Sequence, residues 1–358
     1  MNLRVILLYP FTIIYTIITN FRNHLFNIGY SRSFNYDIMS INVGNLSVGG
    51  TGKTPMVEYL LRLLAKKYAL ATLSRGYKRK TKGFMVASNL STVNDVGDEP
   101  LQLFKKFGKN AVVAVGEERA LAIPKILMEH PETQVILLDD AYQHRTVLPD
   151  FNILLTQFSS PFYSDFVLPA GLLRESRAGA KRADVVVITK CPADLDSDTK
   201  NIIVNKVITY TKVTVPVYFS SIQYGLPISL IENQKFTGRV ILFAGLANME
   251  PLITYIQNTF DLVEVITFND HYDYKLEDIS RLVLEAKKQD AQLLTTEKDI
   301  VKLQSPKFMK VVDSTGLFYL PISVQFLFDE GDSFDEVVFN SIKAKYEIEE
   351  EKLIQENL

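Results

Sequence analysis

Residues able to hold a phosphate group lie early in the chain, in one short run. Residues 47–54 read Ser-Val-Gly-Gly-Thr-Gly-Lys-Thr and follow the apolar run 38–43. Glycines let backbone N–H groups approach phosphate oxygens, a lysine can reach the β- and γ-phosphates, and the next hydroxyl can hold Mg²⁺. A helical pattern over 55–66 follows the run. The order predicts a phosphate-binding loop between a strand and a helix, although Ser47 replaces the usual first glycine.

Each residue of this loop has an expected role. We predict that a nucleotide is bound by Ser47, Gly49, Gly50, Thr51, Gly52, Lys53 and Thr54. Lys53 is also expected to act on the transferred phosphate, and Thr54 on the metal.

Two acidic residues stand at a second strand end. The apolar run 135–138 leads into Asp139 and Asp140. At the carboxyl end of a parallel strand, such acids bind Mg²⁺ or its water shell. The alternative is that both acids cap the next turn, but a phosphate loop elsewhere in the chain favours the metal site. Gln143 and His144 follow in the same loop and are expected to face the substrate.

Three acids near one another are candidates for a general base. Asp95 and Asp98 precede a predicted helix over 99–107, which begins at Glu99, and the spacing of the three acids does not rank them. Aspartate is also a favoured helix cap, and Pro100 suits an early helical position. Capping is therefore the alternative role of Asp98.

Three other charged segments each allow two interpretations. The basic run 75–80 follows a strand end and either receives an anionic substrate, through Arg75 and Tyr77, or is a solvated loop. Arg174 and Glu175 follow a glycine turn and either clamp phosphates or form a surface ion pair. His271 is one of four histidines and lies among acids, where it is either structural or part of a site.

Composition limits the class of protein. The chain has 358 residues, 47% hydrophobic and 22% charged, which is enough for two domains. A net charge of -2 argues against nucleic acid as a partner. Cys191 is the only cysteine, so no intramolecular disulfide forms, and we interpret it as a structural thiol.

Short apolar runs alternate with helical patterns. Strands are expected over 69–73, 111–115, 135–138, 151–155 and 185–189, and helices over 99–107 and 117–128. This predicts an α/β fold: a P-loop doubly wound parallel sheet over 31–217. A connector over 218–236 leads to a second, smaller α/β lobe over 237–330. The charged tail over 331–358 is expected to be an exposed terminal helix.

The first 30 residues are predicted to form a separate N-terminal amphipathic helix. They are mostly apolar, no acid occurs before Asp37, and threonines and asparagines form a thin polar stripe. Pro10 and Arg4 interrupt the apolar run, which is short for a full span. The two interpretations are a helix in the membrane interface, which we favour, and a buried first helix of the core.

Taken together and in order, these motifs resemble the tetraacyldisaccharide 4′-kinase (lipid A 4′-kinase) family. The resemblance lies in residues 44–55, 74–77, 97–100, 138–144, 169–175, 243–248, 268–271 and 295–299. Two departures are Ala141-Tyr142 in place of the commoner Gly-Phe and a tail beyond about residue 330 with no counterpart.

The resemblance implies the chemistry and the roles of several residues. It implies transfer of phosphate from ATP, with Mg²⁺, to the 4′-hydroxyl of the lipid A disaccharide 1-phosphate precursor. The protein would be a monomer at the cytoplasmic face of the bacterial inner membrane. Asp98 would be catalytic with His271 as its partner, Asp139 and Asp140 would hold Mg²⁺, and Arg174 and Glu175 would act near the nucleotide.

Two other functions are weighed against this one. The first is a GTPase or metallochaperone-type NTPase, because residues 188–192 read Ile-Thr-Lys-Cys-Pro and resemble the start of a guanine-reading loop. Pro192 stands where that loop has its base-reading aspartate. The second is a non-enzymatic nucleotide-binding membrane protein, which the paired acids and the candidate base Asp98 argue against.

Overall fold

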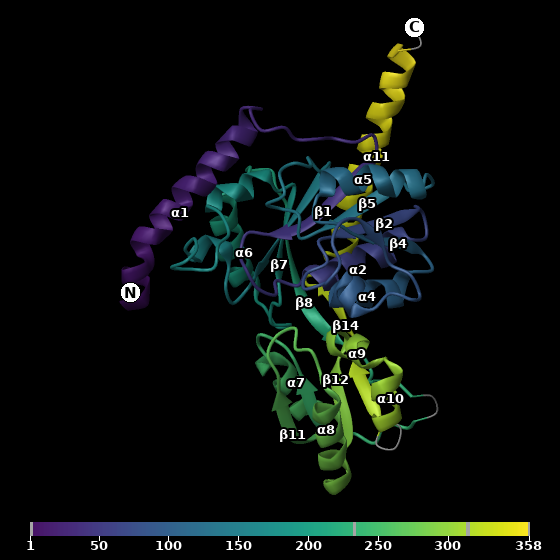
Figure 1. The fold of residues 1–358 in the computed structure, drawn as a ribbon. Helices are drawn as coiled ribbons and strands as arrows, with labels where there is room; N and C mark the ends of the chain where they lie inside the picture. The colour runs from purple at the N-terminus through teal and green to yellow at the C-terminus, as the bar shows by residue number, and fades with distance from the viewer. Residues whose placement is uncertain (1–2, 232–233, 313–315, 357–358) are drawn as a thin grey trace.

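The computed structural model describes residues 3–231, 234–312 and 316–356, which form a larger and a smaller lobe (Figure 1). The ends of the predicted terminal segments, 1–2 and 357–358, and residues 232–233 of the predicted connector lie outside this description. The strands of the larger lobe are β1 (Met39–Asn45), β2 (Leu70–Ser74), β3 (Met85–Val86), β4 (Ala111–Val115), β5 (Val135–Asp139), β6 (Phe151–Gln157), β7 (Val185–Thr189), β8 (Val217–Tyr224) and β14 (Ile322–Phe326).

These strands form one nine-stranded sheet in the order β14-β8-β7-β6-β1-β5-β2-β4-β3. The pairs from β8 to β4 are parallel, and antiparallel β14 and β3 lie at the two edges. Central β1 is buried along its whole length, as its continuous apolar run predicts. The carboxyl end of β1, between β5 and β6, is therefore where the phosphate-binding loop begins.

Helices cover both faces of the large sheet, because alternate strand residues point in opposite directions. The helices of this lobe are α2 (Lys53–Leu64), α3 (Val93–Val96), α4 (Asp98–Phe107), α5 (Arg119–Glu129), α6 (Ser197–Ile208) and α11 (Gly331–Glu356), with 3-10 turns η1 (Phe162–Ser164) and η2 (Arg177–Arg182). Leu137 of β5 shares a core with α2, α4 and α11, whereas Ile136 packs with α5. The predicted doubly wound sheet is confirmed.

The smaller lobe is a second α/β layer, as predicted. Its strands are β9 (Ile228–Ser229), β10 (Arg239–Ala244), β11 (Asp261–Thr267), β12 (Gln292–Thr296) and β13 (Leu317–Leu320), in the order β11-β10-β12-β13-β9. Its helices are α7 (Glu250–Thr259), α8 (Leu276–Lys288), α9 (Glu297–Leu303) and α10 (Pro306–Val312).

Two antiparallel strands join the lobes where the sequence predicted a connector. β8 takes up residues 217–224 and pairs in the large sheet with β7 and with β14, so the chain leaves and re-enters the larger lobe side by side. Ser220 and Ser221, which suggested a loop, are buried strand residues. Residues 322–326, predicted for the smaller lobe, thus belong to the larger one.

The tail also differs from the prediction of an exposed helix. Phe334, Val338 and Ile342 of α11 are fully buried in the core beneath β1, and Tyr59 of α2 donates a hydrogen bond to Asp335 at 2.7 Å. Their spacing of four residues puts all three on one face. The first half of α11 is thus a structural helix of the larger lobe, and its far end projects away from the body (Figure 1).

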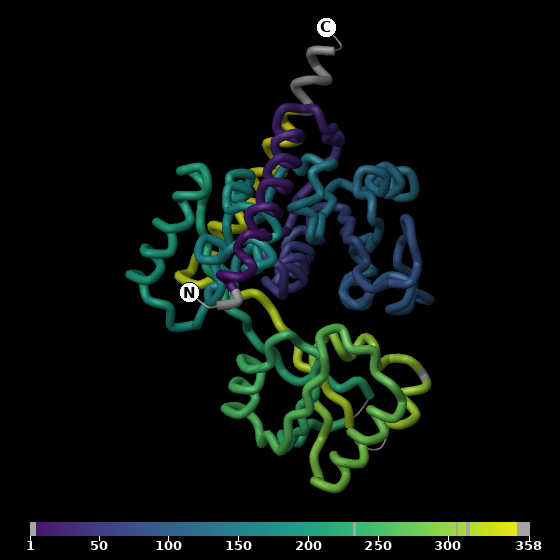
Figure 2. The backbone as a smooth tube through the Cα atoms, turned by 60° about the vertical axis from the view of Figure 1, so that its left-hand side comes forward, coloured from purple at the N-terminus to yellow at the C-terminus, as the bar shows by residue number. Residues whose placement is uncertain are grey.

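The N-terminal helix α1 (Leu3–Asn27) lies along the outside of the larger lobe (Figures 1 and 2). Its polar stripe faces the protein: Thr12 bonds the carbonyl of Val167 at 3.2 Å, and Asn23 donates to Glu175 at 2.6 Å. Only 6% of the apolar 18-residue stretch of α1 is buried inside the protein. The alternative of a buried core helix is therefore wrong.

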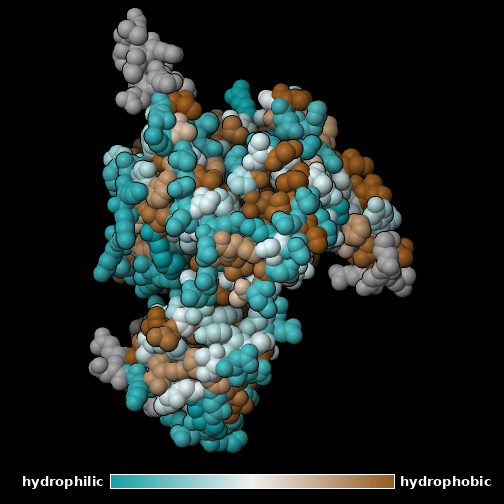
Figure 3. All heavy atoms as spheres, turned by 180° about the vertical axis from the view of Figure 1, so that it is seen from behind, coloured by the Kyte–Doolittle hydropathy of each residue, from teal (hydrophilic) through white to brown (hydrophobic). Residues whose placement is uncertain are grey.

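The apolar face of α1 is left uncovered by the chain. Figure 3 shows hydrophobic side chains gathered along the edge that α1 forms. They include exposed Leu7, Phe11, Ile14, Ile17, Ile18 and Phe21. By length and composition α1 is the one helix, among the described residues, that is able to cross a membrane.

The packing of α11 leads to a stability prediction. Phe334→Ala removes a fully buried ring and is expected to lower the free energy of unfolding by about 3–5 kcal/mol. Ile348→Ala, at a site 52% exposed on the same helix, is expected to change it by less than about 0.5 kcal/mol. Urea unfolding of both variants measures the difference. Equal effects would mean that α11 does not stabilise the larger lobe.

Candidate active site

The phosphate-binding loop has the backbone that its sequence predicts. Gly49 and Gly52 have φ of +106° and +87°, a region that side chains disfavour. Helix α2 begins directly after Gly52, and no side chain caps its first turn. Its first N–H groups are therefore available to an anion at the mouth of the loop.

The loop is held from outside by polar side chains. Asn45 donates to the Thr51 hydroxyl at 2.8 Å, and the Thr189 hydroxyl donates to the Thr51 carbonyl at 2.9 Å. The carbonyl of Gly50 accepts from Gln157 and Lys190, both at 2.6 Å. These contacts, which sequence reasoning missed, come from the carboxyl ends of β1, β6 and β7 and from Lys190 directly after β7, and they hold the loop in place.

Asp139 and Asp140 lie at the end of β5, beside the loop. Asp139 is buried, and its Oδ1 has no hydrogen-bond partner in the described part of the chain. Burial and the nearby Glu99 carboxylate raise the pKa of Asp139 to about 7. Asp140 lies 3.7 Å from Lys53 and 2.8 Å from Arg174; burial opposes its ionisation, but these two cations outweigh it and lower its pKa. Within the described residues, neither carboxylate accepts a hydrogen bond from the backbone of the next turn, so the alternative that both acids cap that turn does not hold.

The structure separates the three acids that the sequence could not rank. Asp95 accepts from the backbone N–H and hydroxyl of Thr92, which makes it a capping-box residue of α3. Asp98 is the first residue of α4 and the cap position is Gly97; its Oδ1 accepts from the Glu99 N–H at 3.0 Å, which leaves Oδ2 for a partner outside the helix. Gly97 has φ +94°, and a Cβ there would lie 2.9 Å from the Tyr77 carbonyl. This close turn aims Asp98 across the gap between the lobes.

Asp98 meets His271 of the smaller lobe. The Asp98 Oδ2 to His271 Nδ1 distance is 2.6 Å, and both side chains are largely buried. His271 has φ +59°, a strained backbone of the kind found at functional sites, and its ring lies 5.2 Å from that of Tyr77. Burial works to raise the pKa of Asp98, but His271 and two lysines outweigh it and lower that pKa.

Those two lysines were missed from the sequence. Lys298 lies 3.1 Å from His271 Nε2, and Lys302 lies 3.8 Å from Asp98. Both belong to α9, whose first turn is held by Asp299 through Thr296 and the N–H of Gly245. The four-residue spacing of the two lysines in a short helix was the available signal, because it places them on one face.

The other residues that the sequence predicted for the site differ in how closely they approach the acids after β5. Arg174 reaches Asp140, as described, but Glu175 is 2% exposed and accepts from Gln143, Arg182 and Asn23, so it organises the loop rather than the opening of the site. Arg75 and Tyr77 are exposed. Burial, followed by the charges of Arg119 and Arg75, lowers the pKa of His144 to about 4 and leaves its ring neutral at pH 7.

A partly buried ion-pair network joins the lobes behind the site. Lys106 of α4 donates to Glu58 of α2 at 2.5 Å and to Glu297 of α9 at 2.7 Å. The other oxygen of Glu297 accepts from the N–H of Ile322, where β14 re-enters the larger lobe. Lys106 therefore connects the helix that carries Asp98 to the helix that carries Lys298.

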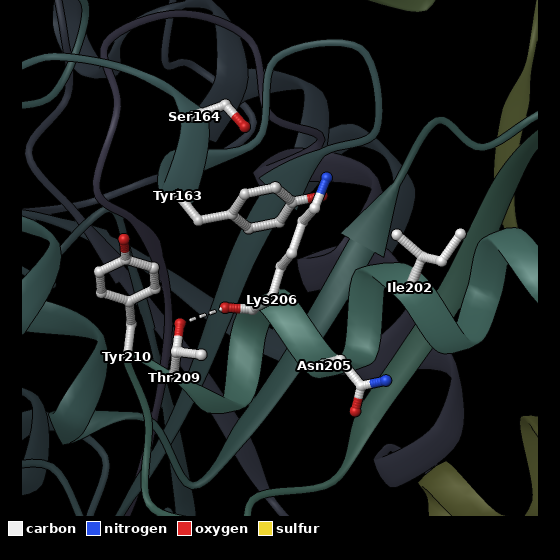
Figure 4. Close-up of a pocket in the computed structure, with 7 residues that line it drawn as sticks. All are labelled: Tyr163, Ser164, Ile202, Asn205, Lys206, Thr209 and Tyr210. Carbon is white, nitrogen blue, oxygen red and sulfur yellow. Dashed lines mark hydrogen bonds between the residues drawn. The ribbon is translucent and has the colours of Figure 1, made fainter.

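Two hollows elsewhere on the surface share no residue with this site. The first, of about 510 Å³, is lined by Tyr163, Lys206, Tyr210 and neighbours from η1 and α6 (Figure 4). The second, of about 470 Å³, lies at the edge of β10 and β11. Neither gathers acids or the phosphate loop, so the candidate active site is the region between the lobes.

Comparison with known proteins identifies the family. A family model described as Tetraacyldisaccharide-1-P 4′-kinase matches residues 4–343. The chain belongs to this family. The match confirms the resemblance seen in the motifs and runs past residue 330, so the tail does have a counterpart in the family as far as residue 343.

Individual relatives agree. The chain is 42% identical to a tetraacyldisaccharide 4′-kinase of Flavobacterium psychrophilum, over 94% of this chain and 96% of that one. It is 41% identical to one of Flavobacterium johnsoniae, over 97% and 100%. A crystal structure of LpxK from Aquifex aeolicus in complex with ATP is similar over 94% of this chain and 99% of that one, with 29% identity and a TM-score of 0.74.

The network between the lobes leads to a pH prediction. Burial and the Glu58 carboxylate raise the pKa of Glu297 above its ordinary 4.5, although Lys106 opposes the shift. A carboxyl with a raised pKa stabilises the fold most below pH 4.5, and this contribution is lost as pH rises through the raised value. In Glu297→Gln the side chain at this position does not titrate, so this loss of stability with rising pH does not occur. The stability of the variant relative to the parent is thus expected to increase from pH 4.5 upward.

Urea unfolding at several pH values measures this change. The matched control is Glu336→Gln, at an exposed position of α11, which is expected to leave the pH dependence of the parent unchanged. A constant stability difference between Glu297→Gln and the parent across this range would show that Glu297 does not titrate differently in the folded protein.

Proposed function

We propose that the protein transfers the γ-phosphate of ATP to the 4′-hydroxyl of a tetraacyldisaccharide 1-phosphate in lipid A synthesis. The observation that carries this proposal is the pair Asp98–His271 beside a phosphate-binding loop. Glu99, next to Asp98, lies near both Asp139 and Lys53, because its carboxylate raises the pKa of Asp139 and the Lys53 charge acts to lower the pKa of Glu99. The Asp98–His271 pair and the phosphate-binding loop thus border the same region between the lobes. The names of the family and of the relatives support the substrate.

The residues divide the work of phosphoryl transfer, which is mostly positioning and charge neutralisation. The loop from Ser47 to Thr54 would hold the phosphates, with Lys53 at the transferred group. Asp98, oriented by His271, would accept the proton of the attacking hydroxyl. Arg174 and its partner Asp140 would lie beside the nucleotide phosphates. Exposed Arg75 and Tyr77 would meet the incoming sugar.

The acids fit a bound Mg²⁺. The buried Asp139 Oδ1, which has no hydrogen-bond partner among the described residues, is an oxygen atom able to bind a cation, and Asp140 lies 3.7 Å from Lys53 of the loop. The Thr54 hydroxyl, next to Lys53, would be a further oxygen ligand. No cluster of three or more His, Cys, Asp or Glu side chains forms a complete metal cage in the described residues. That suits Mg²⁺, which keeps several waters and takes phosphate oxygens as ligands. The ion would neutralise charge on the phosphates.

We also propose that α1 holds the protein at the cytoplasmic face of the inner membrane, without crossing it. Its exposed apolar face and basic residues suit the interface of an anionic bilayer, where the acyl chains of the substrate lie. The polar face is taken up by contacts with the larger lobe, such as Tyr15 to the Arg174 carbonyl at 3.3 Å. A spanning helix would have to break these contacts.

A GTPase is the second candidate that the sequence raised, and the geometry does not favour it. Lys190, the lysine of the loop that resembles a guanine-reading segment, has its ammonium on the Gly50 carbonyl at 2.6 Å. Pro192 offers no carboxylate to a base.

A transfer assay tests the function. With labelled ATP and extracted lipid A precursor, the protein is expected to move the γ-phosphate to lipid, with GTP a poor substitute. Lys53→Ala is expected to lower the rate by at least ~10²-fold, because it removes charge stabilisation at the transferred group. Lys66→Ala, exposed after the end of the same helix, is the matched control and should keep the rate. Wild-type protein that transfers phosphate to no lipid would overturn the proposal.

Membrane attachment has its own test. Replacing Ile14, Ile17 and Ile18 with Ser is expected to release the protein from vesicles that contain anionic lipid, because binding scales with the apolar area buried. Replacing Leu90, Leu121 and Met128, which are exposed apolar residues elsewhere on the larger lobe, with Ser should leave binding unchanged. Co-sedimentation measures both. A tag at residue 1 that is reachable only from the periplasm would show a spanning helix instead.

A further inference from the structure

Lys298 occupies the one nitrogen of His271 that does not face Asp98. Its ammonium lies 3.1 Å from His271 Nε2 and 2.7 Å from Asp270 Oδ1, and its side chain is 18% exposed. It comes from the first turn of α9, which Asp299 clamps. Nothing in the motif that contains it, 295–299, has so far been assigned a role in the reaction.

The chemistry of the two partners fixes the proton on the ring. A lysine ammonium only donates hydrogen bonds, so Nε2 must present its lone pair to Lys298. The Asp98 carboxylate accepts hydrogen bonds, so Nδ1 must carry the hydrogen. We propose that Lys298 is a positioning residue that holds His271 as the neutral tautomer with its hydrogen on Nδ1. This inference deepens the proposed function, because it rests on Asp98 being the base.

The other groups around His271 do not favour this state by themselves. Asp98 and Glu99 of α4 and Asp270 of its own loop are acids, Tyr77 lies against the ring, and Lys302 faces Asp98 rather than the imidazole. Carboxylates on two sides favour the imidazolium. Among the described residues, Lys298 is the cation in contact with Nε2, the nitrogen that would take the second proton. Lys298 therefore decides the protonation state of the His271 ring.

The consequence concerns the path of the proton. When the sugar O–H bond breaks, its oxygen forms a bond to the γ-phosphorus of ATP and its proton goes to an Asp98 carboxylate oxygen. The bond from that phosphorus to the β,γ-bridging oxygen breaks, and ADP leaves with the electron pair. His271 already carries hydrogen on Nδ1, and Lys298 blocks Nε2, so the ring takes no proton from Asp98. His271 therefore orients Asp98 and does not relay the proton. After the product departs, the proton passes from Asp98 to water.

Nitrogen NMR of the histidines tests the inference directly, since protonated and unprotonated ring nitrogens have separate shifts and the chain has four histidines. We expect His271 of the full-length protein to show protonated Nδ1 and unprotonated Nε2 at pH 7. In Lys298→Met both nitrogens should be protonated at pH 7 and titrate at higher pH. Lys298→Arg, which keeps a donor, should restore the parental pattern.

Lys302→Met is the matched control, because it removes the same charge four residues along the same helix without touching His271. Its His271 pattern should be that of the parent. In Lys298→Met the transfer rate should also gain a pH-dependent limb with the midpoint of the His271 titration. We expect a change on the order of 10-fold across that limb, smaller than the ~10²–10⁴-fold of a general base.

Two results would overturn the inference: an imidazolium at His271 in the parent at pH 7, or an unchanged His271 pattern in Lys298→Met. Both are read without any turnover. A failure of the proposed function would appear instead as an absence of phosphate transfer by the parent protein, with the NMR pattern unaffected. The two failures are therefore distinguishable.

Discussion

The contact between Asp98 and His271 is the constraint on which the rest of the structure depends. The residues are 173 positions apart and belong to different lobes, yet their side chains meet at 2.6 Å. Such a contact requires the two lobes to have a defined separation. The paired strands β8 and β14 and the bridge from Lys106 to Glu58 and Glu297 supply it. These elements outside the site keep the Asp98–His271 distance fixed.

Local patterns made much of the fold and half of the site predictable. The loop 47–54, the acids after β5 and the parallel strands each depend on neighbours in sequence, and they lie where the sequence placed them. The rank of Asp98 above Asp95 was not predictable from spacing, because it depends on His271 in another lobe. β8 was missed since Ser220 and Ser221 are buried polar residues. The helix α11 was predicted, but its burial was missed because its many charges obscured the apolar spacing of Phe334 and Val338.

The structure also connects the surface helix to the acid loop. Asn23 of α1 donates to Glu175, which accepts from Gln143, and Gln143 donates to the Asn45 carbonyl just before the phosphate loop. Arg22 of α1 in turn donates to the Gln143 carbonyl at 2.8 Å. An apolar helix that uses its few polar groups in this way is fixed relative to the reaction space. The proposed substrate, whose acyl chains would stay in a bilayer, would need that arrangement.

A double-mutant cycle on the two lobes tests the central claim most directly. The transfer rates of Asp98→Asn, His271→Ala and the double variant would be compared with the parent under single-turnover conditions. If the pair works as one unit, the double variant loses about as much as the more damaging single variant, because the second change removes nothing further. If the two losses multiply in full, Asp98 and His271 act independently, and the account of a site assembled by their contact is contradicted.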